Sequence, residues 1–476
     1  MNNLNLRDYF KIGIFYSLIK YLIMGIGVIK SFYIADALGA TLLGAYAVIM
    51  LIVEYLNYSN LGIFAAMNRD VAIHLEDDLK KNKVKELLDV SLSFAFFPIL
   101  FLSLLFFILD YYEAFFLPEE FFKNTLMILG LVAIYQYKIF LLRYLRLYGR
   151  YFVLAFIELA AQFINLIGVL LFIELYSINA VLWAVLISNI FFVICGFFFL
   201  KSFTFKINFQ LIRYMISVGL PLSIYSIVLL VLSSADRIVI TESFSNRTSL
   251  GLYQFGVMAS QGLFIAFSSI TFLFYPRWIK FLYEKNEKIE SFKLMTKQNE
   301  IVEILLGFLS VFGIMFIPLF IDYFLPQYSA SILVAQLLLL AYMLNGMTFI
   351  TSTFLISNNY QIKLVPIIAL TIFLAFSLNY YFIDLGYGLY GIAFSTILSF
   401  GIYSFLVFYF ASKHSNSLNL RNIYRTFRRI FFFIPISVFI LYENYNLLVI
   451  LFVFAIIYLP LTLKLISKFL EKSFEN

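Results

Sequence analysis

Residues 19–36, IKYLIMGIGVIKSFYIAD, have the length and apolar character of a membrane-spanning helix, but they include two lysines. A hydrocarbon core about 30 Å thick needs roughly 20 predominantly apolar residues per helix. A lysine near the centre of that core costs about 2.5–3.5 kcal/mol on insertion scales. The presence of Lys20 and Lys30 therefore requires a structural or functional reason.

The rest of the chain is equally apolar. Of its 476 residues, 63% are hydrophobic and 13% are charged, whereas soluble domains are about 45–50% apolar and about 25% charged. The composition predicts an all-α integral membrane protein with about 14 transmembrane helices. The expected helices cover 11–34, 41–65, 89–109, 121–142, 151–173, 180–200, 212–234, 250–275, 299–320, 330–356, 364–383, 388–411, 430–443 and 446–466.

The lysines and arginines alternate between the two sides of these helices. With the N-terminus in the cytoplasm, 29 of the 34 fall on the inner side, as the positive-inside rule expects for short loops. The sequence therefore predicts a multi-pass protein of the cytoplasmic (inner) membrane with both termini cytoplasmic. The basic loops are explained by topology and contacts to anionic lipid, so no nucleic acid is expected as a partner.

An internal duplication is also visible. Matching residues recur at nearly one offset, in register with the predicted helices: Gly44 with Gly251, Tyr46 with Tyr253, Arg69 with Arg277, and Ser188 with Ser399. Parallel repeats of this kind build transporters from two halves related by an axis along the membrane normal. We expect two pseudo-symmetric six-helix bundles, 1–206 and 207–412, followed by two C-terminal helices and a cytoplasmic tail in 413–476.

Several expected helices carry polar side chains at helical spacing, such as Glu158, Gln162 and Asn165 on one face. Polar groups inside a membrane usually face a cavity or one another. The candidate substrate-binding residues are Lys20, Lys30, Glu54, Asn57, Glu158, Asp236 and Arg237, and the candidates for an inner gate or interface are Arg69 and Arg277.

The same residues can also have purely structural roles. Lys30 can snorkel to the outer surface, whereas Lys20 lies roughly 13 Å inside the inner boundary, too deep for easy snorkelling. Glu54 and Glu158 can form structural ion pairs with these lysines. Asp236 and Arg237 can form a salt bridge at a helix end, and Arg69 and Arg277 can serve as topology signals.

Five segments carry a resemblance to a known family: ALGATLLGAYAVIM (37–50), NLGIFAAMNRDVA (60–72), VGLPLSIYSIVLLVLSSADRIVI (218–240), SLGLYQFGVMASQG (249–262) and YGLYGIAFSTILS (387–399). Together they resemble the polysaccharide flippases (O-antigen translocases) of the multidrug/oligosaccharidyl-lipid/polysaccharide exporter superfamily. The resemblance implies a central cavity that is open to one side at a time. It also implies a substrate built of a sugar repeat unit on undecaprenyl diphosphate.

On this interpretation the chain moves lipid-linked repeat units from the inner to the outer leaflet for O-antigen, lipopolysaccharide or capsule synthesis. Lys20, Lys30 and Arg237 would then hold the diphosphate, since lysine and arginine neutralise phosphate charge. A polysaccharide polymerase and a chain-length regulator are further candidate partners. No cofactor, metal or catalytic constellation is predicted, and no P-loop is present.

Three different functions stay open beside this one. The first is a cation-coupled exporter of drugs or small amphiphiles from the same superfamily. The second is a membrane-embedded O-acyltransferase or polymerase, and the third is a flippase for lipid II.

Overall fold

The computed structural model describes residues 6–75, 78–111, 123–200, 203–262, 288–358 and 360–415, and isolated positions at 417, 419 and 427. These residues are helical apart from short connections, and they include no strand. Nine stretches within them are long and apolar enough to span a membrane. The prediction of an all-α membrane protein is confirmed. The count of fourteen helices stays a prediction, and the expected helices 430–443 and 446–466 lie outside the described residues.

Two long helices each contain a pair of the expected membrane helices. α1 (Leu6–Leu56) leaves the helical conformation at Gly39, which has φ 65° and ψ 172°. α7 (Tyr151–Phe198) does the same at Ser177, with φ 50° and ψ −126°. Glycine adopts a positive φ readily, whereas a serine there is uncommon. A break of one residue therefore joins each pair where the sequence led us to expect a short loop.

The second expected helix, 41–65, is interrupted before its end. α1 passes into the 3-10 helix η1 (Asn57–Asn60), and Leu61 and Gly62 follow with φ 50° and 81° before α2 (Ile63–His74) begins. Buried backbone groups need partners inside a membrane. Gln136 supplies one, because its Nε2 donates to the carbonyl of Asn57 at 3.2 Å while its Oε1 accepts from Asn60 Nδ2 at 3.2 Å.

The remaining elements follow the expected order with longer or divided helices. In chain order they are η2 (Asp78–Lys80), α3 (Lys81–Phe94), α4 (Phe96–Tyr111), α6 (Thr125–Leu147), α8 (Phe209–Ser243), an unlabelled helix over 247–262, α10 (Lys288–Phe324), η3 (Pro326–Ser331), α11 (Ile332–Gly346), α12 (Thr348–Ser357), α13 (Gln361–Asp384) and α14 (Gly388–His414).

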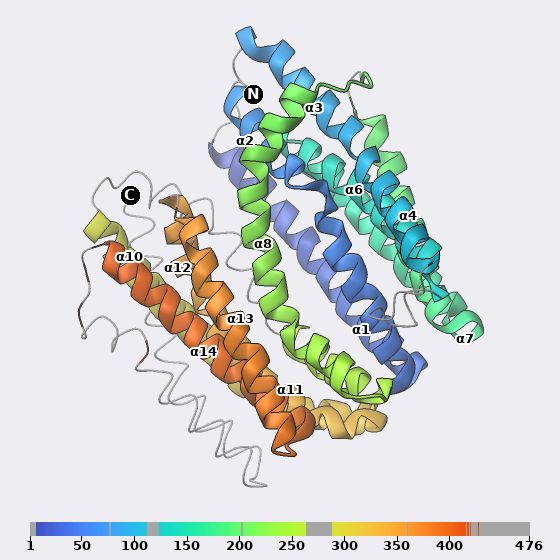
Figure 1. Cartoon of the computed structure of the whole chain (residues 1–476), viewed down its shortest axis with the longest axis vertical. Helices are drawn as coiled ribbons and strands as arrows, with labels where there is room; N and C mark the ends of the chain where they lie inside the picture. The colour runs from blue at the N-terminus through green and yellow to red at the C-terminus, as the bar shows by residue number, and fades with distance from the viewer. Residues whose placement is uncertain are drawn as a thin grey trace. The chain divides into compact units, whose positions relative to one another are not determined.

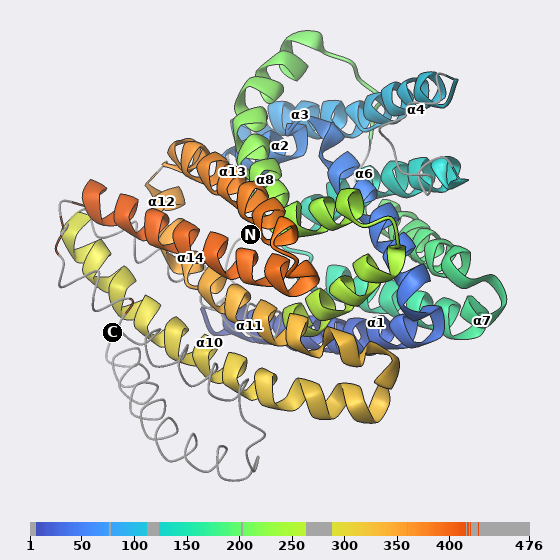
Figure 2. The ribbon, with the colours of Figure 1, turned by 60° about the horizontal axis from the view of Figure 1, so that its bottom comes forward.

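The chain forms two compact units. The first contains 1–234 and 244–251, and the second contains 235–243 and 252–476. In the first unit α7 packs along α1 and α6 (Figure 1). In the second, α14 lies between α11 and α13 (Figure 2). The expected division after residues 206 and 412 stays a prediction.

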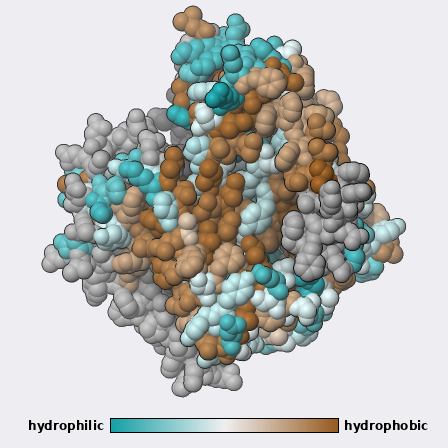
Figure 3. All heavy atoms as spheres, in the orientation of Figure 1, coloured by the Kyte–Doolittle hydropathy of each residue, from teal (hydrophilic) through white to brown (hydrophobic). Residues whose placement is uncertain are grey.

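The surface has the distribution expected of membrane helices. Apolar side chains cover the flanks of the helices in view, and hydrophilic residues gather where α3 begins (Figure 3). Apolar side chains that face lipid need no polar partner. Side chains such as Phe101 and Leu171, which are exposed on the surface of the protein, are therefore expected in a membrane protein. The polar residues that lie away from the helix ends are therefore the informative ones.

Small residues bring the first part of α8 against the rest of the first unit. A Cβ built on Gly62 would lie 2.2 Å from the carbonyl oxygen of Gly219, and one on Gly219 would lie 2.0 Å from that of Gly62. Further along α8, Tyr55 Oη and Ser234 Oγ share a hydrogen bond of 2.6 Å. Close backbone approach at small residues is a common way for membrane helices to associate.

Candidate functional site

A cavity of about 340 Å³ lies inside the first unit. Its walls come from both helical parts of α1, from η1, from α6 and from both parts of α7. Ligand pockets in proteins commonly measure about 300–1,000 Å³, so the space has the size of a small ligand pocket. Three of the sequence candidates line it: Lys30, Asn57 and Glu158.

Lys20 and Glu158 form an ion pair beside this cavity. Lys20 Nζ lies 2.6 Å from Glu158 Oε1, and the side chains are 32% and 11% exposed. Lys20 Nζ also lies 5.4 Å from the centre of the Tyr16 ring, within cation–π range. From the sequence, an ion pair was one of the two roles left open for Lys20 and Glu158, and the structure contains this pair. The interpretation of Lys20 as a phosphate contact stays a prediction.

Two other lysines face the cavity, and neither forms an ion pair in the described part of the chain. Lys30 makes neither a hydrogen bond nor an ion pair there. Lys138 donates to the amide oxygen of Asn189 at 2.7 Å and lies 5.5 Å from the centre of the Phe192 ring. Because the charge of Glu158 is matched by Lys20, the lysines at 30 and 138 leave the lining with a net positive charge.

Sequence reasoning missed Lys138, which it assigned to the inner side with the loop cations. α6 continues to Leu147, so Lys138 lies within the helix, nine residues before its end. Its neighbours Tyr135 and Leu131 line the same cavity at helical spacing. That spacing was the available signal, since it places Lys138 on the same face of an apolar helix as Tyr135.

Neutral polar groups complete the lining. They are hydroxyl and amide side chains, which can both donate and accept hydrogen bonds: Tyr46, Asn57, Tyr135, Gln162, Asn165, Ser188 and Asn189. Gly27 lies beside Gln162, because a Cβ there would lie 3.4 Å from Gln162 Nε2. Three acceptor atoms of lining residues have no hydrogen-bond partner in the described part of the chain: Asn57 Oδ1, Glu158 Oε2 and Asn165 Oδ1.

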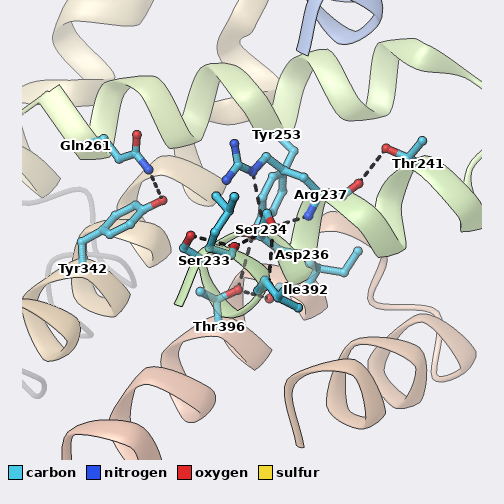
Figure 4. A network of polar contacts seen from close by, with 12 residues as sticks. Ser233, Ser234, Asp236, Arg237, Thr241, Tyr253, Gln261, Tyr342, Ile392 and Thr396 are labelled. Carbon is cyan, nitrogen blue, oxygen red and sulfur yellow. Dashed lines mark hydrogen bonds and ion pairs between the residues drawn. The ribbon is translucent and has the colours of Figure 1, made fainter. Parts of the chain in front are cut away.

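The second unit holds Asp236 and Arg237 in a separate polar network (Figure 4). Tyr253 Oη donates to Asp236 Oδ2 at 2.8 Å and lies 3.4 Å from Thr396 Oγ1. Asp236 Oδ1 accepts from the backbone N–H of Arg237 at 2.7 Å and lies 3.8 Å from its Nε. Gln261 Nε2 donates to Tyr342 Oη at 2.9 Å. Both members of the acid–base pair are largely buried, with side chains 7% and 14% exposed.

The remaining candidates lie elsewhere. Glu54 is exposed and does not line the cavity. Arg69 is exposed on α2, next to the buried Asp70. Arg277 lies outside the described residues. The structure thus brings Lys30, Asn57 and Glu158 together, sets Lys20 beside them through the ion pair, and places Asp236 and Arg237 in the network of the second unit.

The two polar clusters are built from matching positions of the internal repeat. Three pairs of residues from the two clusters are separated by the same 207 positions that separate Gly44 from Gly251: Lys30 and Arg237, Tyr46 and Tyr253, and Tyr135 and Tyr342. The position before Lys30 is Ile29, whereas the position before Arg237 is Asp236. Each unit therefore carries one cation at this position, but only the second unit supplies a carboxylate beside it.

The residues present suit a polar ligand better than a metal ion. Within the described residues, no group of three or more histidine, cysteine, aspartate and glutamate side chains could hold a metal. The cavity of the first unit is instead lined by cations, amides and hydroxyls. The fold around the cavity consists of long helices that are apolar enough to span a membrane.

Solved structures confirm that fold. A structure of the lipid II flippase MurJ in an inward closed conformation matches with a TM-score of 0.68 and 14% identity, over 97% of this chain and 100% of that one. A multidrug-resistance MATE transporter in an inward-facing conformation matches with a TM-score of 0.64 and 12% identity, over 84% and 95%.

A further match is a MOP superfamily transporter from Pyrococcus furiosus, described as having a binding pocket of reverse polarity. It has a TM-score of 0.56 and 15% identity, over 86% of this chain and 96% of that one. No family model and no curated protein sequence matches the chain. The chain therefore shares the fold of these structures, and its ligand has to be inferred from the site.

Proposed function

We propose that the protein is a flippase that moves undecaprenyl-diphosphate-linked oligosaccharides from the inner to the outer leaflet of the cytoplasmic membrane. Alternating access would carry the headgroup across while the lipid tail stays in the bilayer. The product would supply surface polysaccharide, O-antigen or capsule. A polysaccharide polymerase that consumes the repeat units and a chain-length regulator are candidate partners of this activity.

One observation carries the proposal: the cavity of the first unit combines two lysines that form no ion pair among the described residues with seven amide and hydroxyl side chains. Cations in a low-dielectric site attract an anionic headgroup. Amides and hydroxyls match the many donors and acceptors of a sugar. A cavity for cationic amphiphiles would be expected to show the opposite charge, so the headgroup of a lipid-linked glycan suits this lining better.

The MurJ match supports the same class of substrate, because a protein with this fold flips a lipid-linked headgroup. The MATE matches leave the exporter of small amphiphiles as the second candidate. A cavity inside one unit is compatible with either mechanism, so the distinction depends on transport measurements.

The test is flipping in proteoliposomes that contain purified protein and an undecaprenyl-diphosphate oligosaccharide with a fluorescent label on the sugar. We expect protein-dependent transfer of label between leaflets, detected by a membrane-impermeant quencher. A fluorescent cationic amphiphile in parallel vesicles tests the exporter. Movement of the amphiphile without movement of the lipid-linked sugar would overturn the proposal in favour of the exporter.

A further inference from the structure

The connection between α7 and α8 contains a segment that lies against α3. This segment, residues 203–208, is called the strap below; it contains no helix or turn, and α8 begins directly after it at Phe209. Side chains along an extended chain point alternately to opposite sides. The strap therefore has one face formed by its even-numbered residues and another formed by its odd-numbered residues.

The even-numbered face is bound to α3 by polar contacts. Thr204 Oγ1 donates to Asp89 Oδ2 at 2.5 Å, and the backbone N–H of Thr204 donates to Asp89 Oδ1 at 3.3 Å. The backbone N–H of Lys206 donates to Ser93 Oγ at 2.9 Å, and its ammonium group lies 2.7 Å from Glu86 Oε1. These contacts determine which side of the strap faces the protein.

Asn208 fixes the end of the strap in the same orientation. Its Nδ2 donates to Glu86 Oε1 at 3.1 Å. Its Oδ1 accepts from the backbone N–H groups of Gln210 and Leu211 at 3.1 and 3.2 Å, which is the hydrogen bonding of a helix N-cap. The strap is therefore held at both ends of its polar face, and α8 starts from a fixed position on α3.

The odd-numbered face is apolar and points away from α3. It consists of Phe203, Phe205 and Ile207, and Phe209 continues it into α8; these side chains are between 39% and 77% exposed. A non-helical backbone cannot lie in the hydrocarbon core, where its polar groups would lack partners. Exposed aromatic side chains are also unfavourable in water. The boundary between lipid headgroups and acyl chains accommodates both the polar backbone and the apolar side chains.

Cations flank this apolar face. Arg213 is exposed on α8, one helical turn after Phe209, and Lys85 is exposed on α3 next to Glu86, whose carboxylate is paired with Lys206. Exposed lysine and arginine beside an apolar surface attract anionic lipid headgroups. We infer that the strap is a binding surface for anionic phospholipid: its apolar face inserts at the membrane boundary, and Arg213 contacts the lipid phosphates.

The experiment measures the surroundings of one strap side chain by tryptophan fluorescence. The two native tryptophans, Trp183 and Trp278, are changed to phenylalanine, and Phe205→Trp is the reporter. Asn82→Trp is the matched control, because Asn82 is exposed among the lysines at the start of α3. Both proteins are placed in nanodiscs of equal parts phosphatidylglycerol and phosphatidylcholine, with bromine atoms on the acyl chains of one lipid or of the other.

We expect brominated lipid to quench Phe205→Trp at least about threefold more strongly than Asn82→Trp, since an interfacial apolar face lies about 5–10 Å into this boundary. Iodide in the water should show the reverse order. Bromine on phosphatidylglycerol should quench the reporter more than bromine on phosphatidylcholine. Arg213→Gln should remove that difference, whereas Lys413→Gln, at an exposed lysine at the end of α14, should retain it.

Three results would overturn the inference. Strong quenching of Phe205→Trp by iodide without quenching by lipid would show that the strap faces water. Protection from both quenchers would show that protein covers it. Equal quenching by the two brominated lipids would show that the surface does not select anionic phospholipid. None of these measurements depends on transport, so they test the strap separately from the proposed flippase function.

Discussion

The backbone of Gly44 packs directly against that of Gly251, its counterpart in the internal repeat. A Cβ on Gly44 would lie 2.0 Å from the carbonyl oxygen of Arg247, and one on Gly251 would lie 1.7 Å from that of Ala40. Thr41 and Thr248, also separated by 207 residues, share a hydrogen bond of 2.7 Å between their hydroxyls. Residue i thus meets residue i+207 at two neighbouring positions of the first unit.

Substitution of Gly44 by alanine should destabilise the protein. The atoms that a methyl group would meet are backbone atoms, which cannot rotate away, and overpacking costs typically about 1–3 kcal/mol. We expect a lower melting temperature in detergent and less folded protein by size-exclusion chromatography. Gly25→Ala is the matched control, since no atom lies within 4 Å of a Cβ there. Equal melting temperatures for the two variants would contradict the contact.

A disulfide that closes the Thr41–Thr248 contact should stop transport, since alternating access would move one repeat against the other. Hydroxyl oxygens 2.7 Å apart place the two β-carbons within reach of a disulfide. The only native cysteine is Cys195, so Thr41→Cys with Thr248→Cys can be made in a Cys195→Ser background. We expect oxidation to abolish flipping and a reductant to restore it.

Each single-cysteine variant serves as the control for oxidation itself. Wild-type flipping by fully cross-linked protein would show that this contact stays closed throughout transport, and the moving elements would then have to lie elsewhere.

The Lys20–Glu158 ion pair should behave as a coupled structural pair. Loss of one partner leaves a charge in a half-buried site, which we expect to cost about 1–3 kcal/mol, between the values for exposed and buried pairs. Lys20→Met and Glu158→Gln should each lower the melting temperature. The double variant should lose less stability than the two single variants lose together. Strict additivity in this double-mutant cycle would indicate that the 2.6 Å contact contributes nothing.

Loss of the Tyr253 hydroxyl should destabilise the second unit. Tyr253 Oη donates to the buried Asp236 carboxyl, and a hydrogen bond to a charged group contributes about 1.5–3 kcal/mol. We expect Tyr253→Phe to lower the melting temperature by several degrees. Tyr390→Phe, at a tyrosine that is 45% exposed on α14, should have little effect. An unchanged melting temperature for Tyr253→Phe would mean that the Asp236 carboxyl does not need the hydrogen bond from Tyr253.

The sequence by itself determined the class of the fold. Apolar runs of membrane length can satisfy their backbone groups only as helices, so composition and run length were sufficient to predict an all-α membrane protein. The repeat was also visible, because duplication leaves the same residues at one offset. The breaks at Gly39, Ser177 and Leu61 were not predicted, since each depends on how the adjoining helices pack.

Only the tertiary structure decided how the candidate residues group. Lys20 and Glu158 are 138 positions apart, and their pairing depends on the packing of α1 against α7. Lys138 enters the site because α6 turns one face towards the same space. Helical periodicity shows which residues of one helix share a face. The charge of a side chain such as Lys20, however, is neutralised by a side chain of a different helix. Which lysine is neutralised and which is left for a ligand is therefore a property of the folded chain.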